Sequence, residues 1–437
     1  MKKVAVLTDF FDPDFAYSLV SVASNQIKML LRAGYSPRVL VDDHFPDPEK
    51  QPERVPYPWN SVELFRLPSI PRSNFVELHE GWQSDLEKMT VAMREGLKDI
   101  DVVMTHDVIY QPAQLLYQLA ARRIAEERNG SLWFLNLTHS ATTPALISTT
   151  NEYLQAAKQK FPFSYLCYPN EASKPRLARN FGYEEDEIKF TPHATDFCEF
   201  MGFQDITKKL VDEKDMLSAD VIMVYPARLD RGKQLQFNIL TMAELKKLGR
   251  SVRFIAQDFH SSSTDEKDDK RRYREELKKL AAENGLGETE VTFTSEFDES
   301  LRVRCPRQMV RDLMLLANVF ILPSVSETYS LVAQESALCS NFLILNFDFS
   351  PLRSLYGEEA CYFKFSSNLD NMTGFDGETK TSYSPSVNAY CRDIALRIIY
   401  ELENNRVLKL KTRLRKTRSL DYVFRRYWEP LFYAQSG

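Results

Sequence analysis

The chain has 437 residues, and a length of roughly 100–200 residues per domain predicts two domains rather than one large core. Hydrophobic residues make up 43% of the chain and charged residues 27%, which excludes the collagen-like, disordered and disulfide-scaffold classes. The 56 basic and 61 acidic residues leave a net charge of -5, so a nucleic-acid or membrane partner would need a local basic patch.

The cysteines are scattered without a CxxC pair or a Cys/His cluster, a pattern that indicates neither a zinc site nor a disulfide framework. We expect reduced, small core residues at Cys167, Cys198, Cys305, Cys339, Cys361 and Cys391. The apolar run 4–7 is too short for a signal peptide, and no segment approaches the length of a transmembrane helix. We therefore expect a cytosolic protein, in the host cytoplasm if a phage encodes it.

The first half of the chain alternates between short apolar runs and segments of helical periodicity. A helix is predicted over 18–31, ending before Gly34, and a second over 112–128. Strands are predicted at 1–7, 35–41, 101–104, 131–137, 164–167 and 188–191. This alternation is typical of a doubly wound parallel sheet.

The alternation stops between His193 and Ser218, which we interpret as a linker, and then resumes. Strands are predicted at 221–225, 252–256, 291–294, 319–322 and 342–345, with helices at 235–248, 266–283, 307–316 and 330–339. We therefore predict two Rossmann-like domains, 1–200 and 201–410. The C-terminal helix, about 411–437, is predicted to pack back on the first domain.

Two cations follow the first strand of the second half. Arg228 and Lys233 lie between that strand and the next helix, where ligands of open α/β sheets bind. A diphosphate fits such a turn, because it takes charge-assisted hydrogen bonds and benefits from the helix N-terminus. An exposed basic turn that pairs with Asp230 explains the same residues equally well.

Two glutamates lie eight residues apart around the start of a later helix. Glu327 falls in the loop after the strand 319–322, and Glu335 about two turns into the helix, roughly 12 Å further along. Carboxylates at those places can accept hydrogen bonds from sugar hydroxyls. Alternatively, Glu327 only complements the helix dipole and Glu335 is a surface residue.

A histidine follows a strand of the first half. His139 comes directly after the apolar run 132–137 and Thr138. A single histidine is usually structural, but its place at a strand end favours a functional interpretation.

Together these residues resemble the retaining nucleotide-sugar glycosyltransferases of the GT-B fold, specifically the large family numbered four. Segment 323–337 resembles the family's P-S-x-x-E-G-F-G-L-x-x-x-E-A motif, so that Glu327 and Glu335 match its E-x7-E signature. Segment 227–233 is similar to G-R-L-x-x-x-K, and 191–196 to P-N-G-V-D. The order of these motifs along the chain is more specific than any one of them.

The resemblance implies a role for each matching residue. Arg228 and Lys233 would hold the donor diphosphate, Glu335 the ribose, and Glu327, with its neighbours Thr328 and Tyr329, the transferred sugar. His139 would face that sugar from the first domain, as a catalytic residue together with Glu327. The implied reaction retains the anomeric configuration by front-face substitution. It needs no obligatory metal or other cofactor, and its donor is most simply a UDP-sugar.

Several positions depart from the family pattern. The turn 11–18 has no glycine where the family has a glycine-rich loop. Thr328 and Ser330 replace glycines between the two glutamates, Ala194 replaces another, and 257–258 reads Gln-Asp where a glycine usually follows a strand. These departures indicate a divergent member and leave open a sugar- or nucleic-acid-binding protein without turnover.

Asp12 and Asp14 match the D-x-D of metal-dependent GT-A enzymes, but they follow the first strand of the predicted acceptor domain. We interpret them as turn residues.

The sequence does not identify the acceptor. Segment 406–426 holds nine Lys/Arg and one acid, Asp421, and 302–311 holds four arginines. Such a basic stretch could bind DNA, in which case the acceptor would be a hydroxymethylated base, or it could be a solvated helix or rest on anionic lipid. A sugar-nucleotide epimerase is a further alternative.

Overall fold

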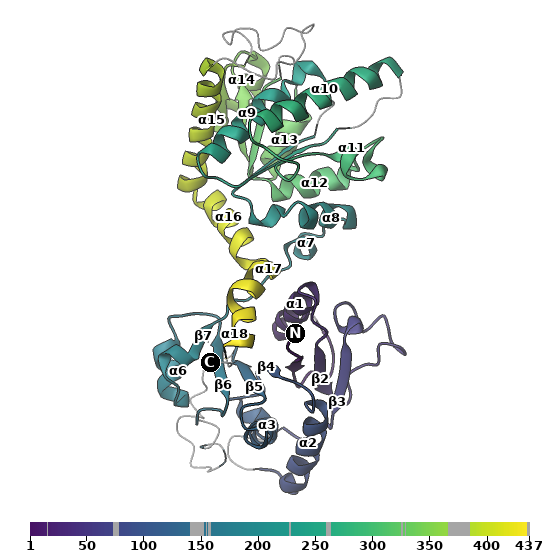
Figure 1. The fold of residues 1–437 in the computed structure, drawn as a ribbon, viewed down its shortest axis with the longest axis vertical. Coiled ribbons are helices and arrows are strands. Elements are labelled where there is room, and N and C mark those ends of the chain that lie inside the picture. The colour runs from purple at the N-terminus through teal and green to yellow at the C-terminus, as the bar shows by residue number, and fades with distance from the viewer. Residues whose placement is uncertain are drawn as a thin grey trace. The chain divides into compact units, whose positions relative to one another are not determined.

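The computed structural model describes residues 1–14, 16–72, 78–139, 153, 155, 159–226, 229–258, 264–324, 327, 329–365 and 385–434 (Figure 1). The chain forms two compact units. Unit 1 comprises Met1–Asp196 and Arg418–Gly437, and unit 2 comprises Phe197–Thr417. The C-terminal segment of unit 1 thus begins at 418, whereas the sequence suggested about 411.

Unit 1 is built on a seven-stranded parallel sheet with the order β3-β2-β1-β4-β5-β6-β7. Its strands are β1 Val4–Leu7, β2 Arg38–Asp42, β3 Glu63–Leu67, β4 Val102–His106, β5 Trp133–Leu137, β6 Ser164–Tyr168 and β7 Ile188–Phe190. The prediction of a doubly wound parallel sheet is confirmed. It omitted the edge strand β3, where Glu63 and Arg66 interrupt the apolar pattern that marks a buried strand.

The helices of unit 1 include α1 Ser18–Arg32, α2 Trp82–Gly96, α3 Leu115–Arg128 and α6 Lys174–Phe181. The C-terminal segment adds α17 Leu420–Val423, the π-helical turn η8 Phe424–Trp428 and α18 Glu429–Tyr433. Phe424, Trp428 and Phe432 are buried there in the same core cluster as Val20 and Ile27 of α1. Burying each large aromatic ring contributes about 1.5–3 kcal/mol, which holds the chain terminus on unit 1.

Unit 2 is built on a six-stranded parallel sheet with the order β10-β9-β8-β11-β12-β13. Its strands are β8 Val221–Tyr225, β9 Val252–Ala256, β10 Val291–Phe293, β11 Val319–Leu322, β12 Phe342–Asn346 and β13 Cys361–Phe363. The five strands predicted for this half are present. The edge strand β13 was not predicted, because three half-buried residues are too few to show a strand pattern.

The helices of unit 2 include α7 Phe197–Phe200, α8 Asp205–Glu213, α9 Leu235–Lys247, α10 Thr264–Glu283, α11 Thr294–Phe297, α12 Arg307–Leu316, α13 Leu331–Leu338, α14 Ser350–Tyr356, α15 Pro385–Asn404 and α16 Arg406–Arg418. The prediction of a linker over 193–218 is wrong for most of that range. Helix α8 buries Leu210 and Val211 in a core cluster of unit 2, whereas its charged residues face outward and hid the helical pattern.

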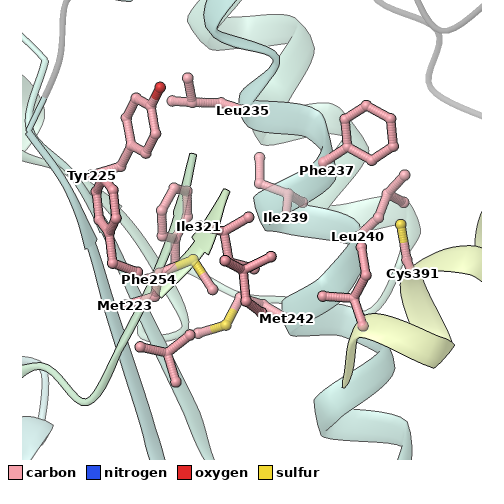
Figure 2. Close-up of a cluster of buried hydrophobic side chains, with 14 of the residues drawn as sticks. Met223, Tyr225, Leu235, Phe237, Ile239, Leu240, Met242, Phe254, Ile321 and Cys391 are labelled. Carbon is pink, nitrogen blue, oxygen red and sulfur yellow. The ribbon is translucent and has the colours of Figure 1, made fainter. Parts of the chain in front are cut away.

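Helix α9 forms the centre of the unit 2 core. All residues of 235–245 are buried, as expected for a helix covered on every side. Figure 2 shows Leu235, Phe237 and Met242 of α9 among side chains from the strands and Cys391 of α15. This packing anchors the turn between β8 and α9, which carries Lys233.

All six cysteines are free; Cys167, Cys198 and Cys391 are buried and the other three are half-buried. None of the helices in the described part of the chain is long and apolar enough to cross a membrane.

Candidate functional site

The carboxyl ends of β8 and β11 bring two predicted site residues together in unit 2. The two strands are neighbours in the sheet, and the loops that follow them carry Lys233 and Glu327. Lys233 Nζ donates a hydrogen bond to the Glu327 carboxylate and lies 3.5 Å from Ser324 Oγ. The two side chains are only 20% and 15% exposed, so this ion pair is partly shielded from solvent.

The turn before Lys233 is fixed by a different arginine. Arg231 donates two hydrogen bonds to Glu276 of α10, at 2.7 and 2.9 Å, and its guanidinium lies 5.0 Å from the ring centre of Tyr273. The hydrogen bonds to Glu276 raise the pKa of Arg231. Gln234, in the left-handed conformation at φ 52°, then connects this turn to α9. Arg231 is thus a structural anchor, and Arg228 lies outside the described residues.

The turn before α13 keeps a left-handed conformation without a glycine. Ser330 has φ 63°, and its Oγ accepts a hydrogen bond from Ala333 N at 3.4 Å as the cap of α13. Tyr356 Oη donates to the Ser330 carbonyl at 3.0 Å. A non-glycine residue in this conformation costs about 1–2 kcal/mol, which these contacts help to offset. Ser330 therefore adopts a backbone conformation that glycine would adopt without this cost.

Two buried polar groups at adjacent strand ends have no hydrogen-bond partner among the residues that the structure describes. They are the Tyr225 hydroxyl, at the end of β8, and the Gln257 side-chain amide, directly after β9. Burial, and then the negative charge of Glu327, raise the pKa of Tyr225 well above its usual value. An unpartnered buried polar group costs about 1–3 kcal/mol. Sequence reasoning missed Tyr225, although a polar residue at the end of an apolar strand was a usable signal.

Glu335 contacts helix α12. Its carboxylate accepts from Arg307 Nη2 of α12 at 3.1 Å, and it lines a cavity of about 360 Å³ with Met314 and Leu338. Among the described contacts, none joins Glu335 to Lys233 or Glu327. Thr328 lies outside the described residues, and Tyr329 is exposed.

In unit 1, His139 belongs to a row of three histidines. His106 ends β4, His139 follows β5 and His193 follows β7. The ring centres of His106 and His139 are 5.3 Å apart, and those of His139 and His193 are 5.1 Å apart. Burial lowers the pKa of His139 and of His193 to about 4, and that of His106 well below 6.5. All three rings are therefore neutral at pH 7.

A chain of hydrogen bonds assigns the tautomers of this row. Gln26 Oε1 lies 2.7 Å from His106 Nε2, and His106 Nδ1 lies 3.2 Å from His139 Nε2. If Gln26 accepts through its oxygen, His106 Nε2 donates to it and His139 Nε2 donates to His106. His139 Nδ1 is then left as a buried acceptor without a partner.

Unit 1 also holds a polar cavity of about 490 Å³ at the ends of β1, β2 and β3. Asp9, Asp42, Arg72 and Gln114 are among the residues that line it. Burial raises the pKa of Asp9, although Arg72 and Gln114 both donate to its carboxylate. Asp42 accepts from Ser69 Oγ at 2.8 Å. The cavity therefore presents two hydrogen-bonding carboxylates and several donors.

The D-x-D segment adopts a turn. Asp14 Oδ1 accepts from Ala16 N at 2.9 Å, the side-chain to backbone bond of an Asx turn, and Asp12 pairs with Arg54. Over the described parts of the chain, no three His, Cys, Asp or Glu side chains gather closely enough to hold a metal ion.

The basic stretch 406–426 does not present all of its cations to solvent. Arg415 is buried and donates to the Met216 and Ala219 carbonyls at 2.8 and 2.6 Å. Lys411 donates to the Ala317 carbonyl at 2.8 Å, and Lys416 pairs with Asp220. Burial lowers the pKa of Lys411 to about 8 and that of Arg415 to about 10. Five of the nine are exposed, namely Arg406, Lys409, Arg413, Arg425 and Arg426.

No family model and no curated protein match the sequence. Among solved structures, the chain is similar to a glycosyltransferase from Rickettsia africae, at 12% identity over 100% of this chain and 99% of that one, with a TM-score of 0.36. It is also similar to sucrose-phosphate synthase from Thermosynechococcus elongatus, at 15% identity over 97% and 96%, with a TM-score of 0.33. A third similar structure is Anabaena HepE in complex with UDP-glucose, at 14% identity over 100% and 98%, with a TM-score of 0.32. Likeness at this level assigns no activity, so the function must be argued from the residues of this chain.

Proposed function

We propose that this protein is a retaining glycosyltransferase that moves a sugar from a nucleoside-diphosphate sugar, most simply a UDP-sugar, to a hydroxyl acceptor. The observation that carries the proposal is the Lys233–Glu327 pair at the carboxyl ends of β8 and β11. It joins a cation and a carboxylate, 94 residues apart in the chain, at the edge of an open sheet where ligands bind.

The two members of the pair can bind different parts of a nucleotide sugar, the charged diphosphate and the sugar hydroxyls. As the donor enters, Lys233 exchanges the Glu327 carboxylate for a diphosphate oxygen, a charge-assisted contact worth about 1.5–3 kcal/mol. Glu327 is then free to accept hydrogen bonds from hydroxyls of the sugar. Arg228 would add a second cation on the diphosphate. Glu335 would reach the ribose by leaving Arg307, a solvent-exposed partner that holds it weakly.

The reaction follows from stabilising the departing group. The bond between the anomeric carbon and the diphosphate breaks while the acceptor oxygen bonds to the same face of that carbon. The diphosphate leaves with the acceptor's proton, so no protein nucleophile is needed. Lys233 stabilises the negative charge that develops on the leaving oxygen, which is electrostatic catalysis.

We assign two further hydroxyl-binding places to unit 1. The 490 Å³ cavity, with Asp9 and Asp42, fits a hydroxyl-rich acceptor because carboxylates accept hydrogen bonds from hydroxyls. His139 would accept a ligand hydroxyl at Nδ1, which is buried and has no partner among the residues that the structure describes. Because its pKa is about 4, His139 binds as a neutral ring at pH 7 rather than as an acid.

The test is nucleotide release from UDP-, GDP- and ADP-glucose, with sugar, lipid or hydroxymethylpyrimidine-DNA acceptors and with none. Lys233→Ala should abolish release, whereas Lys279→Ala, which removes an exposed lysine of α10 that pairs with Glu283, should not. Equal turnover by both variants would contradict the site. Release that needs modified DNA would identify a nucleic-acid acceptor. Donor breakdown to free sugar and nucleotide without any acceptor would instead favour epimerase-type chemistry.

A further inference from the structure

Helix α16, which precedes the C-terminal segment in Figure 1, has three stripes of different chemistry. Leu408, Lys411 and Arg415 face unit 2: Leu408 and Arg415 are buried, and the two cations donate to backbone carbonyls of that unit. Residues spaced by three and four positions share one face of a helix. Residues 407, 410 and 414 form a second stripe about 100° from this packed face, and residues 406, 409 and 413 form a third stripe about 100° further round. The remaining stripes therefore face solvent.

The stripe next to the packed face is apolar. Val407, Leu410 and Leu414 are 66%, 45% and 38% exposed, although an amphipathic helix normally buries its apolar residues. Leu338, at the end of α13, is 78% exposed. Its α13 neighbour Ala337 lines one cavity together with Val407 and Leu408, whereas Leu338 itself lines the cavity that also holds Met314 and Glu335. An exposed apolar stripe such as that of α16 indicates a binding surface.

The outermost stripe is basic. Arg406, Lys409 and Arg413 are exposed, and none of them has an ion-pair partner among the residues that the structure describes. Helix α16 contains no acidic residue, in a chain whose net charge is -5. The local charge is therefore opposite to that of the whole molecule and complements an anionic surface.

We propose that this face of α16 binds the surface of an anionic lipid bilayer. The apolar stripe enters the boundary between headgroups and acyl chains, while the basic stripe lies on the anionic headgroups. Nucleic acid fits less well. A phosphate backbone rewards the cations but not an aliphatic stripe, and α16 offers no aromatic ring on which a base could stack.

The test is sedimentation of the full chain with vesicles of phosphatidylcholine alone or with roughly one-third phosphatidylglycerol. The wild type should bind the anionic vesicles, less tightly at high salt, and should hardly bind the neutral ones. K409Q/R413Q should weaken binding about 25-fold, because each cation near such a surface contributes about fivefold. L410S/L414S should weaken it about tenfold or more at unchanged salt dependence.

Exposed residues of unit 1 supply the controls: Lys98→Gln and Val91→Ser should both bind like the wild type. All substituted side chains are exposed, so the thermal unfolding midpoint should not change. Three results of the vesicle assay would overturn the proposal. The first is no binding to anionic vesicles, and the second is binding that L410S/L414S leaves intact. The third is duplex DNA that binds the chain more tightly than the vesicles do and displaces them. Lipid-independent dimerisation that L410S/L414S abolishes would also overturn it, because a second copy would then cover the stripe.

Discussion

Replacing Lys233 with methionine removes the ammonium group of the Lys233–Glu327 pair and keeps a side chain of similar length. In the free protein, the change leaves Glu327 without its cation in a site only 15% exposed. We expect a loss of about 1–3 kcal/mol in the free energy of unfolding, the cost of an unsatisfied, largely buried polar group. Donor binding should suffer as well, because the variant lacks one charge-assisted contact and keeps a carboxylate that repels the diphosphate.

The expected loss of UDP affinity is roughly 10- to 150-fold, the equivalent of about 1.5–3 kcal/mol. A second variant separates stability from binding. In Lys233→Met/Glu327→Gln, the unpaired charge is gone, so urea unfolding should recover most of the lost stability while UDP binding stays weak. Calorimetric titration with UDP at fixed ionic strength measures the affinity.

Wild-type UDP affinity in Lys233→Met would refute the assignment of Lys233 to the diphosphate. Recovery of affinity along with stability in the double variant would show that the pair acts only through the fold.

Three further predictions concern other parts of the molecule. Burial lowers the pKa of His139 and His193 from 6.5 to about 4, so between these pH values the unfolded chain binds more protons than the folded protein. The free energy of unfolding should therefore be constant above pH 6.5 and fall as the pH drops toward 4, by at most about 3 kcal/mol per histidine. Equal urea midpoints at pH 7 and pH 5 would contradict this prediction. Trp428→Ala should lower the free energy of unfolding, measured in urea, by about 3–5 kcal/mol, because the ring is buried. Val91→Ala, at an exposed position, should change that free energy by less than about 0.5 kcal/mol. Similar values for the two variants would argue against packing of the C-terminal segment on unit 1. Ser330→Val should lower the thermal unfolding midpoint, because a β-branched residue at φ 63° is strained. Ser330→Gly should keep the midpoint close to that of the wild type. A lower midpoint for the glycine variant than for the valine variant would be inconsistent with the left-handed turn.

The sequence was informative wherever the signal is local. Alternating apolar runs and helical periodicity identified most strands of both sheets, because side-chain burial repeats along each element. The short or charged edge strands β3 and β13 were not found, since an edge strand is covered less completely and carries a weaker pattern. Helix α8 was taken for a linker because only its buried face is apolar.

The candidate site also contains residues that the sequence identified and residues that it did not. Position after a strand singled out Lys233, Glu327 and His139 from sequence alone. It did not indicate Arg231 as the anchor of its loop, because Glu276, which binds it, lies 45 residues away on another helix. Nor did it show that Glu335 pairs with Arg307, or that Tyr225 is buried without a partner. These facts depend on which elements are neighbours in space.

By itself, the sequence determined the two parallel sheets and the residues that stand at their strand ends, because both follow from local patterns of burial and turns. The tertiary structure decided which of those residues meet. Lys233 contacts Glu327 because β8 lies beside β11, an order set by packing across the whole sheet. The tertiary structure also decided which cations of α16 are buried and which form an exposed stripe beside the apolar one. Only the packing of the helix on unit 2 distinguishes buried Arg415 from exposed Arg413.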